Sequence, residues 1–265
     1  MPETRPIVLS IAGYDPSSGA GVTADIKTIA AHGCYGVTCI TALTIQTTQG
    51  VKRVEAVPGR LVAETLEALA GDVALSAVRI GMLGSGDVAE AVAEFLGKRR
   101  LRNVVLDPVL RASSGLDLLD ERGVGVVRKR LLELVDVITP NLNEAAALSG
   151  AEVSDLAGMK RAAARLHEMG ARAVVVTGGH LKSPVDVLSI GGKVTTFAGK
   201  GIDSQSTHGT GCAFATSLAC NLARGFELKD SVSAAGQYVR RAIERAYRVG
   251  KGKGPLHHLY GMREA

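Results

Sequence analysis

Residues 206–212 read STHGTGC and lead into the run AFATSLACNLA at residues 213–223. Glycine and hydroxyl residues ahead of a run of small and apolar residues predict a buried helix that begins near residue 209. The first four N–H groups of a helix have no internal partner, and glycines let an anion approach them closely. The motif therefore predicts either an anion site, capped by Ser206 or Thr207, or an ordinary glycine-rich helix start.

Apolar runs alternate with helical patterns along the rest of the chain. The strand-like runs are PIVLSIAG (6–13), VTCITALTIQ (37–46), VKRVEAV (51–57), AVRIGML (77–83), NVVLDPVL (103–110), VDVITPN (135–141) and ARAVVVTGG (171–179), followed by a hairpin over 185–199 with Gly191 and Gly192 at its turn. Strands rich in Val and Ile that are separated by helices indicate a mostly parallel sheet covered on both faces. We expect one α/β domain over residues 1–265, closed by two helices near 209–224 and 228–248.

Composition excludes several classes of protein. The chain has 265 residues, 46% of them hydrophobic and 22% charged, which is typical of a globular protein. No apolar run approaches the roughly 20 residues of a membrane span, and the N-terminus has the pattern of a strand rather than a signal peptide. Aromatic residues make up only 3% and the net charge of +5 is scattered, which argues against nucleic-acid binding. We therefore expect a cytoplasmic protein that acts on small molecules.

The four cysteines, Cys34, Cys39, Cys212 and Cys220, form no CxxC pair and suggest no zinc site. Three of them lie in apolar surroundings and are expected to be core residues. Cys212 instead falls at the predicted helix start, where a thiolate is stabilised and can accept a proton from a substrate hydroxyl. The alternative is that its small side chain simply fits there.

Polar residues follow several of the predicted strands, at the edge where parallel sheets bind ligands. They are Tyr14, Asp15, Gln46, Asp107, Asn141, Glu144 and residues 177–180, and Met82 follows another strand at the same edge. The sequence contains no GxxxxGK[ST] motif, and GMLGSG has the wrong spacing for a dinucleotide fingerprint. A nucleotide must therefore be held in a different way.

Five motifs in this order resemble the ribokinase superfamily: AGYDPSSGAG, VVLDPVL, ITPNLNEA, TGGH and THGTGC. Within it, THGTGC and the late GKGPLHH resemble the hydroxymethylpyrimidine/phosphomethylpyrimidine kinases of thiamine biosynthesis. The resemblance covers almost the whole chain. It implies a three-layer α/β/α domain that uses ATP and Mg²⁺ to phosphorylate a pyrimidine alcohol, and then the resulting monophosphate.

The same resemblance assigns roles around the transferring phosphoryl group. The anion hole would consist of Gly209, Thr210, Gly211 and Cys212, with Cys212 at the position where most sugar kinases of the superfamily have an Asp base. The NxxE pair, Asn141 and Glu144, would organise magnesium through waters, and Asp107 would lie near the same metal and the phosphates. Thr177 and His208 belong to the nucleotide-facing set, although for His208 hydrogen-bonding support is equally compatible.

For the pyrimidine, the matching positions are Gly13, Asp25, Gln46 and Met82. The Gln46 amide offers a donor and an acceptor to an aminopyrimidine edge, and Met82 can cover the ring face. Asp25 lies within a predicted helix, where a solvated helix face is the competing interpretation.

Two positions depart from the family pattern. Thr177 stands where the family has a lysine that meets the ATP phosphates, so Lys182 or another cation must compensate or the second phosphorylation is weaker. In TIQTTQG, at residues 44–50, Thr47 stands where an Asn more often follows the Gln. His180 and His208 are both retained.

Two other functions fit the same motifs. A pyridoxal kinase shares the fold, the anion hole and an aromatic hydroxymethyl substrate. A non-catalytic pyrimidine-binding protein would retain the pocket without turnover, and Thr177 keeps this alternative open. The resemblance also implies a homodimer.

Overall fold

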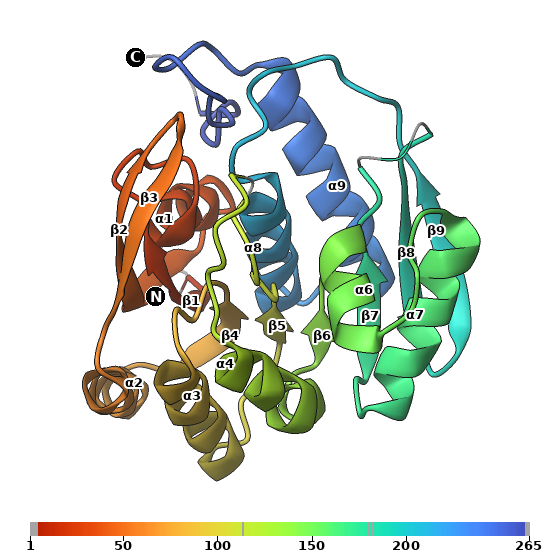
Figure 1. Cartoon of the computed structure of the whole chain (residues 1–265). Helices are drawn as coiled ribbons and strands as arrows, with labels where there is room; N and C mark the ends of the chain where they lie inside the picture. The colour runs from red at the N-terminus through yellow and green to blue at the C-terminus, as the bar shows by residue number, and fades with distance from the viewer. Residues whose placement is uncertain (1–4, 113, 180, 182, 263–265) are drawn as a thin grey trace.

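One sheet runs through the molecule in the computed structural model, which describes residues 5–112, 114–179, 181 and 183–262. Its strands are β1 (Ile7–Tyr14), β2 (Tyr35–Thr47), β3 (Gly50–Ala56), β4 (Leu75–Ile80), β5 (Val104–Leu106), β6 (Val137–Ile138), β7 (Ala173–Val176), β8 (Val185–Ile190) and β9 (Lys193–Ala198). Their order is β3-β2-β1-β4-β5-β6-β7-β8-β9. The six central strands, β2, β1, β4, β5, β6 and β7, are parallel to one another (Figure 1). At the edges of the sheet, β3 pairs with β2, β8 with β7 and β9 with β8, and each of these three pairs is antiparallel. The expectation of a mostly parallel sheet is confirmed.

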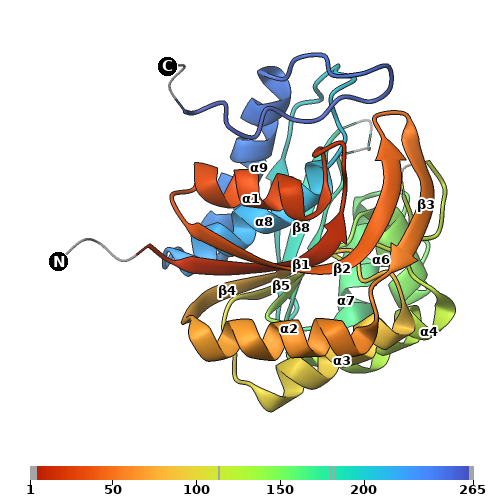
Figure 2. The same ribbon diagram turned by 90° about the vertical axis from the view of Figure 1, so that its left-hand side faces the viewer.

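Helices cover both faces of this sheet, as Figure 2 shows. One face carries α1 (Gly21–Ala31), α8 (Thr210–Ala223) and α9 (Leu228–Glu244). The other carries α2 (Gly59–Asp72), α3 (Gly86–Lys98), α4 (Glu121–Val126), a π-helical turn (Val127–Leu131), α5 (Leu132–Leu134), α6 (Leu142–Ser149) and α7 (Leu156–Glu168). The molecule is therefore the expected three-layer α/β/α structure.

Alternating strand residues divide the apolar core into two layers. In β5, Val105 packs in the cluster formed with α8 and α9, whereas Val104 and Leu106 pack in the cluster formed with α3 and α7. All three side chains are buried. Since both faces need apolar side chains, these strands show continuous Val and Ile runs rather than alternation.

Two central strands are shorter than their apolar runs suggest. The run NVVLDPVL gives only the three residues of β5, and VDVITPN gives only the two of β6. Each run contains a proline, Pro108 or Pro140, which has no N–H to donate to a sheet ladder. The chain therefore leaves the sheet early at these points, and Asp107 and Asn141 lie at the sheet edge where the ligand site is expected.

The hairpin of β8 and β9 follows the prediction closely. It turns at Gly191 and Gly192, whose φ angles are 53° and 82°.

In the described part of the chain, no helix is long and apolar enough to cross a membrane.

Candidate active site

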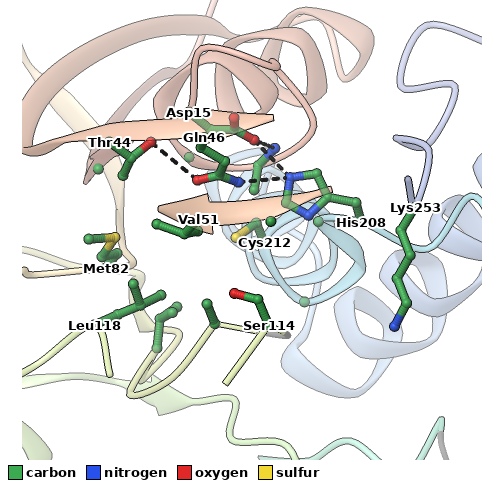
Figure 3. A pocket seen from close by; sticks show the side chains of 18 of the residues that line it. Asp15, Thr44, Gln46, Val51, Met82, Ser114, Leu118, His208, Cys212 and Lys253 are labelled. Carbon is green, nitrogen blue, oxygen red and sulfur yellow. Dashed lines mark hydrogen bonds and ion pairs between the residues drawn. The ribbon is translucent and has the colours of Figure 1, made fainter. Parts of the chain in front are cut away.

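A cavity of about 590 Å³ lies at the carboxyl ends of the parallel strands, beside the N-terminus of α8. The predicted site residues that line it are Gly13, Gln46, Met82, Asp107, Asn141, Glu144, His208, Gly209, Thr210, Gly211 and Cys212. Asp25 and Thr177 do not line it. Figure 3 shows Gln46 and Met82 on the same side of Cys212, with His208 on the other side. The structure thus gathers segments that are up to about 200 residues apart in the sequence.

The N-terminus of α8 is open toward this cavity. Its N-cap is Gly209, and no side chain caps it, so the expectation of a Ser206 or Thr207 cap is wrong. The first hydrogen bond of the α-helical ladder runs from the N–H of Ala213 to the carbonyl of Gly209. The N–H groups of Gly211 and Cys212 have no protein acceptor among the described residues, and both residues line the cavity. Such a helix end favours an anion.

Only glycine fits at position 209. Its φ angle is 85°, and a Cβ at this position would stand 1.9 Å from the carbonyl oxygen of Gly19. The loop that follows β1 therefore packs directly against the start of α8. This contact fixes where the open N–H groups point.

Apolar side chains line another part of the same cavity. Met82 packs so closely against Gly13 that a Cβ on that glycine would lie 3.0 Å from the Met82 Sδ atom. Leu118 and Val109 pack in the same cluster as Met82. Together with Val51, these side chains line a space that suits the face of a small ring.

The polar end of this space is formed by Gln46, His208 and Asp15. His208 Nε2 lies 2.8 Å from Asp15 Oδ2 and 3.1 Å from Gln46 Nε2 (Figure 3). A single ring nitrogen cannot donate to the carboxylate and accept from the amide at the same time. The Gln46 amide therefore keeps hydrogen-bonding capacity for a ligand, while Thr44 Oγ1 lies 3.2 Å from its oxygen.

Asp15 organises the loop below His208, a role that the sequence did not reveal. Its carboxylate accepts hydrogen bonds from the N–H groups of Ser17, Gly19 and Ala20, at 2.8, 3.2 and 2.9 Å. Burial alone would raise the pKa of Asp15, but hydrogen bonds from His208 and Ser17 outweigh it and lower that pKa below its usual value. The charged carboxylate thus holds both the loop and the imidazole.

A buried charge network forms the floor of the site. Arg79 is fully buried and donates to Asp25 Oδ2 at 3.0 Å and to Asp107 Oδ2 at 2.7 Å. The sequence carries a signal for it, since Arg79 is a charged residue in the middle of the apolar run AVRIGML. The apolar pattern of that run predicts only a buried strand and does not show the two carboxylates that Arg79 binds.

Asp25 belongs to this network and not to the pyrimidine site. Its two oxygens accept from Ser10 Oγ at 2.6 Å, Thr216 Oγ1 at 2.7 Å and Arg79. The predicted substrate contact is therefore wrong, and so is the alternative of a solvated helix face. Its helix, α1, packs against both β1 and α8, which points Asp25 into the core.

The expected thiolate at Cys212 is not supported either. Burial, opposed in part by Arg79 and strengthened by Asp107, raises the pKa of Cys212 to about 12. At neutral pH the group is a thiol. The helix N-terminus favours a negative charge, but two neighbouring carboxylates and the loss of solvent outweigh that effect.

Asn141 and Glu144 form a capping box at the start of α6. Asn141 Oδ1 accepts from the Glu144 N–H at 3.0 Å, and Glu144 Oε2 accepts from the Asn141 N–H at 2.9 Å. Burial, with a further contribution from the charge of Asp107, raises the pKa of Glu144 to about 8. Thr177 lies beside Asn141 at the end of β7, joined to it by a bridge. His180 and Lys182 lie outside the described residues.

Comparisons with known proteins show the family to which the chain belongs. Residues 15–257 match the family model described as Phosphomethylpyrimidine kinase. The chain is 39% identical to Hydroxymethylpyrimidine/phosphomethylpyrimidine kinase of Aquifex aeolicus, over 93% of this chain and 97% of that protein. It is 42% identical to Thiamine biosynthesis bifunctional protein ThiED of Geobacter sulfurreducens, over 99% of this chain, and spans only 54% of that longer relative.

A solved structure is also similar over nearly its whole length. The ADP complex of Bacillus subtilis pyridoxal kinase has a TM-score of 0.88 and 33% identity, and the match covers 96% of this chain and 98% of that one. The fold and the site together define a small-molecule kinase with the ribokinase-like architecture. Within that class, the chain belongs to the phosphomethylpyrimidine kinase family.

Proposed function

We propose that this protein uses ATP to phosphorylate 4-amino-5-hydroxymethyl-2-methylpyrimidine to its monophosphate and then to the diphosphate, in thiamine biosynthesis. The observation that carries the proposal is the pairing, in one cavity, of an open helix N-terminus with an apolar wall and the Gln46 amide. The first element suits a transferring phosphoryl group and the second suits an aminopyrimidine. The relatives named above support the same reaction.

In this proposal the pyrimidine ring lies between Met82 and Leu118, and its amino edge faces Gln46. The hydroxymethyl group then points toward Cys212, at the start of α8. The N–H groups of Gly211 and Cys212 stabilise charge on the phosphoryl oxygens during transfer. Positioning and charge stabilisation supply most of the acceleration of phosphoryl transfer, because its transition state is loose.

Cys212 acts on the acceptor hydroxyl by contact and orientation. A loose transition state needs little removal of the hydroxyl proton before the phosphoryl group moves, and the proton can then pass to the transferred phosphate, so a thiol is compatible with turnover. Cys212→Ala should therefore lower kcat by at least about tenfold and weaken pyrimidine binding much less. Single-turnover rates and pyrimidine titrations measure the two effects, and an unchanged rate with weakened binding would contradict the role.

Asp107 and Glu144 are the residues that would hold Mg²⁺. Both line the cavity, and the charge of Asp107 disfavours ionisation of Glu144, so the pair has room for a counter-charge. Carboxylate oxygens are ligands that Mg²⁺ prefers, directly or through water. Bound magnesium would neutralise charge on the nucleotide phosphates. Glu144→Ala should lower turnover more than it weakens pyrimidine binding, as measured by the same titrations.

The decisive experiment is product analysis with ATP and three acceptors: the pyrimidine alcohol, its monophosphate and pyridoxal. We expect conversion of the alcohol to both phosphates and efficient use of the monophosphate. The likeness to pyridoxal kinase favours that enzyme as the second candidate, which would phosphorylate pyridoxal and ignore the monophosphate. Pyrimidine binding without ATP consumption would instead identify a non-catalytic binding protein. A further variant tests the position where the family has a lysine. If the lack of a cation at Thr177 limits the rate of phosphorylation, Thr177→Lys should raise that rate.

We also propose that the chain acts as a single domain, as a homodimer, in the cytoplasm, where ATP is available. The exposed side chains of Leu43 and Ile45 on β2 supply an apolar surface for a second copy, because 51% and 52% of their areas are accessible. Light scattering should give about twice the chain mass of 27.5 kDa. A mass equal to one chain would exclude the dimer.

A further inference from the structure

A C-terminal strap, residues Gly250–Pro255, crosses the rim of the cavity. The Gly252 N–H donates to Thr48 Oγ1 at 3.1 Å, and the Gly254 N–H donates to the Gln205 carbonyl at 3.0 Å. The strap thus joins the β2–β3 turn to the loop that precedes α8. Both of its lysines, Lys251 and Lys253, line the cavity.

The glycines of the strap allow this close contact. A Cβ on Gly252 would stand 2.0 Å from the Thr48 carbonyl oxygen, and a Cβ on Gly254 would stand 2.8 Å from Ser206 Oγ. Only glycine lets the backbone lie against both walls at these positions. The pattern G-K-G-K-G therefore places two lysines at the rim of the site. Figure 3 shows Lys253 beyond His208, on the side away from Met82.

These lysines differ in charge environment from the other basic residues of the cavity. Arg79 is bound to Asp25 and Asp107, and Arg111 donates to Asp117 at 2.7 Å. Within the described residues, neither Lys251 nor Lys253 makes an ion pair with a carboxylate. Ammonium groups without such partners are suited to a phosphate.

The position of the strap favours the acceptor over the nucleotide. The strap is attached to the turn after β2, the strand that carries Gln46. Of the metal-binding candidates, Asp107 follows β5 and Glu144 lies in the helix that follows β6. In the sheet, β1 and β4 separate β2 from β5, and β5 separates them further from β6. The alcohol is uncharged, whereas its monophosphate carries close to two negative charges. Cations on the acceptor side therefore distinguish the second substrate from the first.

We propose that Lys251 and Lys253 bind the phosphate of the monophosphorylated pyrimidine and make the second phosphorylation efficient. This proposal rests on the proposed function. No bond to either lysine forms or breaks, because their contribution is electrostatic attraction and orientation.

The test compares Lys251→Met, Lys253→Met and the double variant with the unmodified enzyme. For the double variant, kcat/KM for the monophosphate should fall at least about tenfold more than kcat/KM for the alcohol. Calorimetric titration should show weaker binding of the monophosphate by a similar factor. Added NaCl should weaken monophosphate use in the unmodified enzyme and have less effect in the double variant. Lys229→Met, on the exposed face of α9, is the matched control.

Any other outcome of this test counts against the proposal. Equal losses with both acceptors, or no loss with either, would show that the lysines do not discriminate between them. A rise in the KM for ATP alone would assign them to the nucleotide. If the unmodified enzyme phosphorylates neither pyrimidine, the proposed function itself fails. If it phosphorylates both and the variants behave like Lys229→Met, only the role of the strap fails.

Discussion

Arg79 places a full positive charge in a part of the sheet that water does not reach. Its guanidinium lies between Asp25 and Asp107, so three charged groups are buried together. Such a network depends on every member, because removing one leaves the others in a medium that solvates charge poorly. The network also sets the position of Asp107 at the edge of the cavity.

Arg79→Met should lower the free energy of unfolding by about 3–5 kcal/mol, because it leaves two buried carboxylates without their cation. Arg79→Lys keeps the charge and should lose less. Urea denaturation measures both changes. The control is Arg99→Met, which breaks the partly exposed pair with Glu67 and should cost less than about 1 kcal/mol. Equal losses for the Arg79→Met and Arg99→Met variants would contradict the account of the network.

Gln46→Ala should raise the KM for the pyrimidine by at least about tenfold and leave kcat within a few fold, because in the proposed complex the amide binds the ring and not the reacting group. Initial rates over a range of pyrimidine concentrations test this. The control is Gln237→Ala on the exposed face of α9, which should match the unmodified enzyme. An unaltered KM would remove Gln46 from the substrate site.

At the scale of elements, the start of α8 is where the proposed function places the phosphoryl group. Its N-cap, Gly209, lies against the carbonyl of Gly19 in the loop after β1. A side chain at Gly209 would push the helix start and that loop apart. The open N–H groups of the first turn would then no longer converge on one oxygen.

Gly209→Ala should therefore lower kcat by at least about tenfold, because an oxyanion-type site loses its geometry. Gly225→Ala is the matched control at the other end of the helix. Gly225 has nearly the same φ angle, 87° against 85°, but nothing lies within 4 Å of its added Cβ. The control should lose about 1 kcal/mol of stability and keep its turnover. Similar turnover in both variants would show that the Gly19 contact does not matter.

The sequence predicts the elements better than it predicts side-chain partners. Runs of Val and Ile identify the strands, and THGTGC identifies the start of α8. The same patterns do not show which way Asp25 points on α1, because that depends on α8 packing over it. Nor do they reveal the raised pKa of Cys212, which depends on Asp107 and on burial. Local patterns specify backbone form, whereas these properties arise from segments far apart in the chain.

At the scale of the whole molecule, the C-terminal segment links stability to pH. His258 is buried, with 2% of its area accessible. Burial, with a contribution from the charge of Lys27, lowers the pKa of His258 from 6.5 to about 4. Above pH 6.5 the group is neutral in both the folded and the unfolded chain. Below that pH the unfolded chain takes up the proton more readily, so stability falls as the pH approaches 4.

The unmodified protein should lose on the order of 2 kcal/mol of unfolding free energy from this group between pH 7.5 and pH 5. His258→Gln should remove much of that pH dependence, while His257→Gln, at the half-buried neighbour, should retain it. Urea denaturation at both pH values provides the comparison. Parallel pH profiles for all three proteins would exclude His258 as the source.

The protonated state of Cys212 has a consequence for chemical intervention. Electrophilic drugs that target cysteine depend on a thiolate, and this sulfur offers very little of it at neutral pH. Such warheads would react slowly here even when they reach the pocket. Reversible compounds are the better starting point for inhibition. They should fill the hydrophobic side of the cavity next to Met82 and place an anionic group at the N-terminus of α8.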